Sequence, residues 1–327
     1  MPDTQVVRLR DPAELIAAIP YLIGFHPSDC FVVCGLAAES PVLHMRVDAD
    51  AGSQPAALAR MFASHLQRAR AESLILVGYG ATAAGTISQV ADAMHSGPLV
   101  VLDVLTVLDG RWRSLLCESA ACCPPGGSPI PVAEQLPVVA QLVAAGRVAR
   151  RDRSELICDV EADAKRQTDV AAHIVRIAEL TPLPAAGLLQ QWLDVGTAIG
   201  AGSELPSASV SAQLLHGLRN VRVRDDLMGE IARDPIGLEP LLTWLASSCP
   251  THEAAPIFTL TALPAWLRGD GARASQLLEL ALNADPDYRL AQLLDLGLSA
   301  GLPPAEIAAI CRSAGAGADE DAPAAAS

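Results

Sequence analysis

The order in which strand-like and helix-like segments follow one another constrains the fold of this chain most. Runs rich in Val, Ile and Leu, typical of β-strands, occur only in the first half, at residues 30–37, 41–50, 73–80 and 98–117. Amphipathic helical segments lie between them, and from about residue 160 onward the pattern is helical throughout. We therefore predict an α/β domain over residues 1–160 and an all-α domain over 161–315.

Two of the predicted strands, 30–37 and 41–50, are separated by only a few residues, too few for a crossover helix. They are expected to pair as an antiparallel hairpin, whereas the strands joined by helices favour parallel pairing. A further turn is expected at Asp109–Gly110, inside the long extended segment. The sequence thus predicts a mixed sheet.

The helical half contains one regular pattern of small and turn-forming residues, at Ala262, Gly269, Ala274, Ala281 and Pro286. This spacing resembles the tetratricopeptide consensus, in which small residues let two antiparallel helices approach closely. The chain shows one clear copy, and about three repeats are needed for an independent array. A tetratricopeptide-like hairpin and an ordinary helical hairpin therefore both remain open.

Charge excludes some classes of partner. The chain has 327 residues, and 37 acidic residues against 23 basic ones give a net charge of −14. Such a surface repels phosphate groups, so we expect neither nucleic acid nor a membrane as a partner. The start of the chain lacks the pattern of a secretory signal, and we expect a cytoplasmic protein. The acidic, low-complexity stretch 316–327 is expected to be a disordered tail.

The stretch CESAACCPPGG places Cys117, Cys122 and Cys123 within seven positions. In a reducing cytoplasm these thiols are expected to be free. They are the candidates for a metal site, but zinc usually takes four ligands in short-spaced pairs, and adjacent cysteines do not fit that pattern easily. Our prediction is a loop of structural thiols, with no metal and no cofactor.

Five polar residues are candidates for binding a small anionic ligand: His26, Asp29, Arg46, Asp48 and Arg111. His26 and Asp29 belong to GFHPSD, which precedes the strand at 30–37 and so lies at its amino edge, whereas α/β sheets bind ligands at carboxyl edges. Arg46 and Asp48 share one face of the next strand, where a solvated ion pair is the simpler expectation. A single pocket gathering all five would favour a ligand site.

Several stretches together resemble one protein family: IPYLIGFHPSDCFVV, LHMRVD, DGRWRSLLCESAACCPPGGSPIP, NVRVRDDL and the segment AWLRGDGARASQLLELALNADPDYRLAQLLDLGLSAGLPP. They are similar to an actinobacterial family of uncharacterised cytoplasmic proteins catalogued as a domain of unknown function. The resemblance implies that the GFHPSD and CCPPGG loops are family features, and it implies no activity.

No dinucleotide-binding, P-loop, nucleophile-elbow or zinc-protease motif occurs in the chain, so the sequence leaves open whether it is an enzyme. The leading hypothesis is a protein-interaction or regulatory module that binds a protein partner through its helical domain. The alternative is a sensor or enzyme that binds a small anion in the α/β domain.

Overall fold

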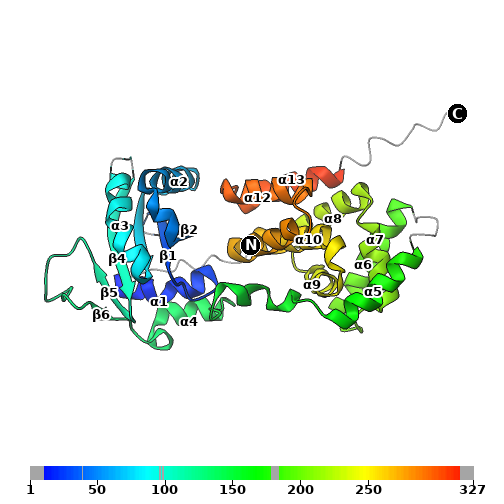
Figure 1. Cartoon of the computed structure of the whole chain (residues 1–327), viewed down its shortest axis with the longest axis horizontal. Coiled ribbons are helices and arrows are strands. Elements are labelled where there is room, and N and C mark those ends of the chain that lie inside the picture. Colours follow the sequence, from blue (N-terminus) through cyan, green and yellow to red (C-terminus); the bar gives the residue numbers. More distant parts are fainter. Residues whose placement is uncertain (1–10, 39, 96, 98, 178–183, 317–327) are drawn as a thin grey trace. The chain divides into compact units, whose positions relative to one another are not determined.

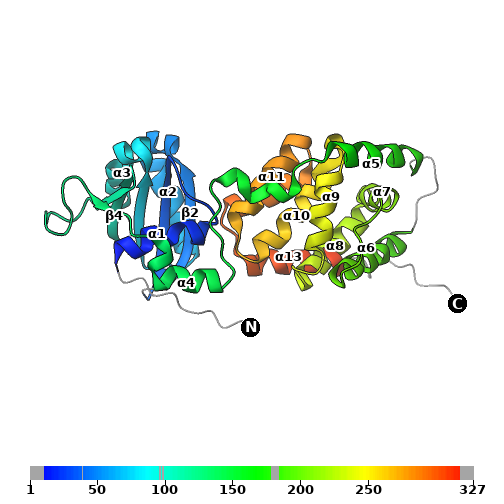
Figure 2. The same ribbon diagram turned by 90° about the horizontal axis from the view of Figure 1, so that it is seen from below.

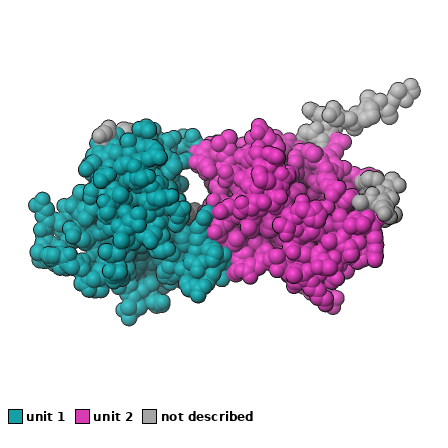
Figure 3. Space-filling view, in the orientation of Figure 1, with its two compact units in different colours: residues 1–155 teal, residues 156–327 magenta. Residues whose placement is uncertain are grey.

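The structure, a computed structural model, describes residues 11–316 except 39, 96, 98 and 178–183 (Figure 1). The chain divides into two compact units, Met1–Glu155 and Leu156–Ser327, each of which is described by itself (Figure 3). Residues 317–327 of the expected acidic tail lie outside the described residues.

The first unit is built on a six-stranded mixed sheet with the order β2-β1-β3-β4-β5-β6. Among the described strands, β3 and β4 are parallel and the other neighbours are antiparallel. The predicted α/β mixed sheet is therefore confirmed. The strands are β1 (Cys30–Ala37), β2 (Ser40–Asp48), β3 (Ser73–Tyr79), β4 (Val100–Leu108), β5 (Arg111–Ser114) and β6 (Ser128–Pro129).

Helices lie on both faces of this sheet. Alternate residues of β1 and β3 pack with α2 and α3 into one core, whose largest buried side chains include Phe31, Phe62 and Ile87. Helix α1 contacts β2 and packs against α4, and Figure 2 shows both helices across one face of the sheet. The helical elements here are α1 (Pro12–Ile23), η1 (Ala49–Ser53), α2 (Pro55–Arg68), α3 (Gly80–His95), η2 (Ala133–Gln135), α4 (Pro137–Ala144) and η3 (Arg153–Val160), which crosses the unit boundary.

Local chemistry explains where several elements begin and turn. Asp11 caps α1, because its Oδ1 accepts a hydrogen bond from the Glu14 backbone N–H at 2.8 Å, and Pro12 occupies the first helical position. Asp109 and Gly110 both have positive φ, 50° and 70°, as a tight hairpin turn between β4 and β5 requires. The turn predicted at this position is confirmed.

The second unit is helical, as expected, and its described residues form a hydrophobic core that includes Trp192, Leu214 and Leu227. None of the described helices is long and apolar enough to cross a membrane. The elements are α5 (Ala164–Ile177), α6 (Ala185–Gly200), α7 (Ala208–Gly217), α8 (Val221–Arg233), α9 (Glu239–Ser248), η4 (Thr251–Glu253), α10 (Ala254–Leu267), α11 (Gly271–Ala284), α12 (Arg289–Ser299) and α13 (Pro304–Ala316).

Helices α10 and α11 form the hairpin that the spacing of small residues indicated. Ala262, Ala274 and Ala281 are all buried between packed helices, and Gly269 turns the chain with a φ of 81°. These small side chains permit the close approach of the two helices. Whether the hairpin is of the tetratricopeptide class stays a prediction, since any closely packed helix pair benefits from alanine at such positions.

Candidate functional site

The alternation seen in β2 places His44, Arg46 and Asp48 on the face opposite Met45 and Val47, which pack into the α2–α3 core. The Arg46 guanidinium Nη1 lies 2.6 Å from Asp48 Oδ1. The ion pair expected here is present. It is not fully solvated, because the Arg46 side chain is 19% exposed against 66% for Asp48.

The neighbouring groups on this sheet face are held uncharged by burial. Burial, and then the positive charge of Arg147, lower the pKa of His44 to about 4. Burial raises the pKa of Cys30, although the adjacent Arg46 opposes this shift, and burial raises the pKa of Tyr79 well above its usual value. A protonated thiol is a poor nucleophile, so Cys30 is not poised for covalent chemistry.

The GFHPSD loop precedes β1, so the sequence placed it at the amino edge of that strand, away from the edge where ligands bind. The sheet topology changes this placement. Because β1 runs antiparallel to β3, the amino end of β1 lies beside the carboxyl end of β3, with Cys30 opposite Tyr79. This is the edge where α/β sheets hold ligands. Asp29 packs here against Gly80, the first residue of α3, while His26 is exposed and its backbone N–H donates to the Arg150 carbonyl at 2.9 Å.

Arg111 lies on β5, separated from β2 by three strands. Its Nε donates to the Gly126 carbonyl at 2.6 Å, and its Nη2 donates to the Gly127 carbonyl at 2.5 Å. The guanidinium therefore fastens the loop that follows the cysteines. Among the five anion candidates, the structure pairs Arg46 with Asp48 and places Asp29 at the adjoining sheet edge, while Arg111 belongs to another part of the unit.

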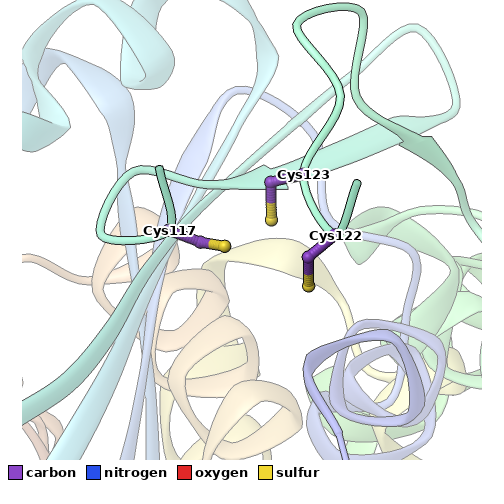
Figure 4. A group of neighbouring side chains, drawn as sticks. All are labelled: Cys117, Cys122 and Cys123. Atoms are coloured by element: carbon purple, nitrogen blue, oxygen red, sulfur yellow. The ribbon is translucent and has the colours of Figure 1, made fainter. Parts of the chain in front are cut away.

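The three cysteines of the CESAACCPPGG loop form a cluster. The sulfur atoms of Cys117, Cys122 and Cys123 all lie within 4.8 Å of one another, and Figure 4 shows the Cys117 side chain directed toward the segment that carries the other two. A turn at Ser119 causes this approach, because its carbonyl accepts hydrogen bonds from the backbone N–H groups of Cys122, at 3.1 Å, and Cys123, at 2.7 Å. The spacing of the cysteines in the sequence did not indicate this convergence.

The helical unit contains a cavity of about 280 Å³ that sequence reasoning missed. Its walls come from η3, α5, α9, η4, α10 and α11, and most of the lining side chains are apolar. Gln167 Nε2 donates to the Cys249 carbonyl at 2.8 Å between two of the walls. The residues that line it are Ile157, Val160, Glu161, Ala162, Gln167, Ala246, Cys249, Thr251, Ala254, Phe258, Leu280, Asn283 and Ala284.

The cavity lining is suited to binding rather than to catalysis. Burial raises the pKa of Cys249, its thiol-bearing member, to about 12, so the thiol stays protonated and unreactive at neutral pH. Gln167, Asn283 and Glu161 supply a few polar groups around apolar walls. A mostly apolar pocket with a small number of polar groups is the usual form of a site that takes an apolar group and orients it.

Taken together, these features define a protein with a mixed α/β unit that carries an anchored thiol loop and a helical unit that carries an apolar cavity. The model of the family described as Domain of unknown function (DUF4192) matches residues 12–305, which is most of the chain. The chain belongs to this family. No curated protein and no solved structure matches it.

Proposed function

We propose that this chain is a regulatory interaction protein whose helical unit binds a basic segment of a partner protein and takes one apolar side chain of that segment into the cavity. The cavity is the observation that carries the proposal. A space of about 280 Å³ with apolar walls matches a large apolar side chain, and such anchored side chains dominate the energetics of many protein interfaces.

The distribution of charge supports a basic partner. Residues 156–327 hold 22 of the 37 acidic residues of the chain but only 11 of its 23 basic ones, so this unit carries most of the net negative charge. Glu161 brings one carboxylate to the cavity lining itself. Opposite charges accelerate encounter and orient the partner, while the cavity supplies most of the affinity.

The test is selection of short displayed peptides on the full-length chain, followed by binding measurements with the selected peptides. Ala284→Leu narrows the cavity, whereas Ala308→Leu adds the same atoms at a partly buried helical alanine that does not line it. We expect basic peptides with one large apolar residue, lost affinity in A284L, unchanged affinity in A308L and weaker binding at high salt. Failure to select any peptide, or equal binding by A284L, overturns the proposal.

The location, the origin and the alternative function of the protein are also matters of proposal. A cytoplasmic location and an actinobacterial origin are what the family resemblance implies. The alternative function, recognition of a small anion in the α/β unit, has less support, because the two arginines proposed for it, Arg46 and Arg111, already hold Asp48 and the loop carbonyls. The ion pair offsets the charge of Arg46, and the two carbonyls occupy Nε and Nη2 of Arg111, so each guanidinium has less to offer an added anion.

A further inference from the structure

The cysteine loop is built so that its three thiols remain together. On one side of them, the buried Ser114 Oγ accepts hydrogen bonds from the backbone N–H groups of Leu116 and Cys117, both at 3.1 Å, and donates to Asp103 Oδ1 at 2.6 Å. On the other side, Arg111 holds the carbonyls of two glycines. Both ends of the loop are therefore fixed to β4 and β5.

Gly127 makes the second attachment possible. It has a φ of 71°, and a Cβ at this position would lie 2.9 Å from the Trp112 carbonyl oxygen. Only glycine accepts this backbone conformation without strain and lets the loop pass so close to β5. The Pro and Gly residues after the cysteines thus serve to return the chain to the sheet, where Ser128 pairs with Trp112.

The thiols influence one another electrically. Two hydrogen bonds to the Cys117 sulfur lower the pKa of this thiol. The larger effect comes from the Ser119 backbone N–H and the smaller from the Cys123 thiol. The pKa of Cys122 is raised, chiefly by its hydrogen bond to Cys117 and by the charge on that sulfur. A cation placed among the three sulfur atoms attracts all of them and favours their thiolate form.

We propose that Cys117, Cys122 and Cys123 form a binding site for one thiophilic d10 cation, Zn²⁺ or Cu⁺, coordinated by three thiolates. Soft thiolate ligands select these ions over Mg²⁺ or Ca²⁺. With a metal–sulfur distance of about 2.3 Å, tetrahedral geometry separates the sulfurs by about 3.8 Å. The sulfur atoms already lie within 4.8 Å of one another. Each pair therefore has to approach by no more than about 1 Å to reach the distance that a bound metal requires.

The site leaves one coordination position open to an external ligand. Among the described residues, no fourth His, Cys, Asp or Glu joins this group, and Cys122 is exposed at its surface. Three protein ligands with a free position are typical of zinc sites that exchange or activate a ligand, whereas structural zinc sites are closed by four. Trigonal coordination by three thiolates would equally satisfy Cu⁺. Binding replaces thiol protons by the metal, so protons are released into solution.

The test is titration of the reduced full-length chain with Zn²⁺, and separately with Cu⁺, each in competition with a chromophoric chelator. Cd²⁺ serves as a spectroscopic probe, because thiolate–cadmium bonds absorb in the ultraviolet. We expect one ion per chain with release of protons, and at least tenfold weaker binding in each of C117S, C122S and C123S. Cys158, an exposed cysteine outside the cluster, provides the control C158S, which should bind like the parent. Because thiolates bind Cu⁺ more tightly than Zn²⁺ in general, coordination number identifies the ion: three sulfurs alone for Cu⁺, three sulfurs and one external ligand for Zn²⁺.

A second measurement needs no variant. Bound metal should protect three cysteines of the parent chain from alkylation, identified by peptide mass analysis as Cys117, Cys122 and Cys123, while Cys158 still reacts. The proposal is overturned by binding of less than one ion per chain, by equal losses in C158S and the cluster variants, by absent thiolate–cadmium absorption, or by unprotected cluster thiols. These results are independent of peptide binding by the helical unit, so this inference and the proposed function fail separately.

Discussion

Arg273 on α11 and Asp159 on η3 are joined by two parallel hydrogen bonds, Nη1 to Oδ1 at 2.8 Å and Nη2 to Oδ2 at 2.9 Å. The same guanidinium donates to the Leu156 carbonyl, and the Arg273 side chain is only 12% exposed. Both η3 and α11 contribute walls to the cavity of the helical unit. This ion pair therefore fixes the distance between two walls of the proposed binding site.

Arg273→Lys should destabilise the chain by about 1–2 kcal/mol, because lysine keeps the charge but loses the planar fork that holds two carboxylate oxygens and a carbonyl. It should also weaken binding of the selected peptides. Arg268 provides the matched control, since it binds Glu239 in the same two-pronged way, at 2.7 and 2.6 Å, away from the cavity lining. R268K should lower the free energy of unfolding without changing peptide affinity; equal effects on binding would contradict the assignment of the cavity.

Gly80→Ala should be more harmful than an ordinary glycine substitution. Gly80 has a φ of 82°, and a Cβ there would lie 2.1 Å from Asp29 Oδ1. Gly110→Ala is the control, since Gly110 also has positive φ, 70°, but has no neighbour within 4 Å of its Cβ position. In denaturant unfolding we expect a loss of about 1 kcal/mol for G110A. For G80A we expect about 1–3 kcal/mol, because the exposed Asp29 carboxylate must also rotate away and the Asp29 Cα lies 3.1 Å from the added Cβ.

The pH dependence of stability should report the burial of His44. Its folded-state pKa, about 4, is lower than the value of 6.5 for an exposed histidine. Between these values the unfolded chain binds the extra proton, so the free energy of unfolding falls as pH decreases from about 6.5 to 4, by about 3 kcal/mol in all. His44→Gln should flatten this slope in urea titrations at several pH values, and His252→Gln at an exposed position is the control. An unchanged slope in H44Q would show that other groups cause it.

Alkylation should divide the eight cysteines into two classes in the metal-free native chain. Burial raises the pKa of Cys34 and Cys249 to about 12 and that of Cys311 to about 11, and these side chains are also shielded from reagent. Cys117, whose pKa is lowered, should react at lower pH than an ordinary thiol. Peptide mass analysis of iodoacetamide-treated protein across a pH series checks this order. Early modification of the buried cysteines would contradict the core placement.

Local patterns in the sequence were sufficient for the architecture. Period-two alternation in 42–48 separates Met45 and Val47, in the core, from His44 and Arg46 on the other face, as found. The Asp109–Gly110 turn and the small residues of the α10–α11 hairpin were also readable, since turn geometry and close helix packing demand particular residues at particular positions. These features depend on residues a few positions apart.

The candidate sites depended on contacts between distant segments. Antiparallel pairing of β1 with β3 places Asp29 beside Gly80, and no local pattern specifies which strand a given strand will pair with. The local turn at Ser119 brings the three cysteines together, but Ser114 and Arg111 decide where on the sheet their loop is held. The apolar cavity exists because six elements pack around it. The sequence by itself determined the kinds of elements and their order, through local periodicity and turn chemistry. Only the tertiary structure decided which polar groups meet, because long-range pairing and packing bring residues together that are remote along the chain.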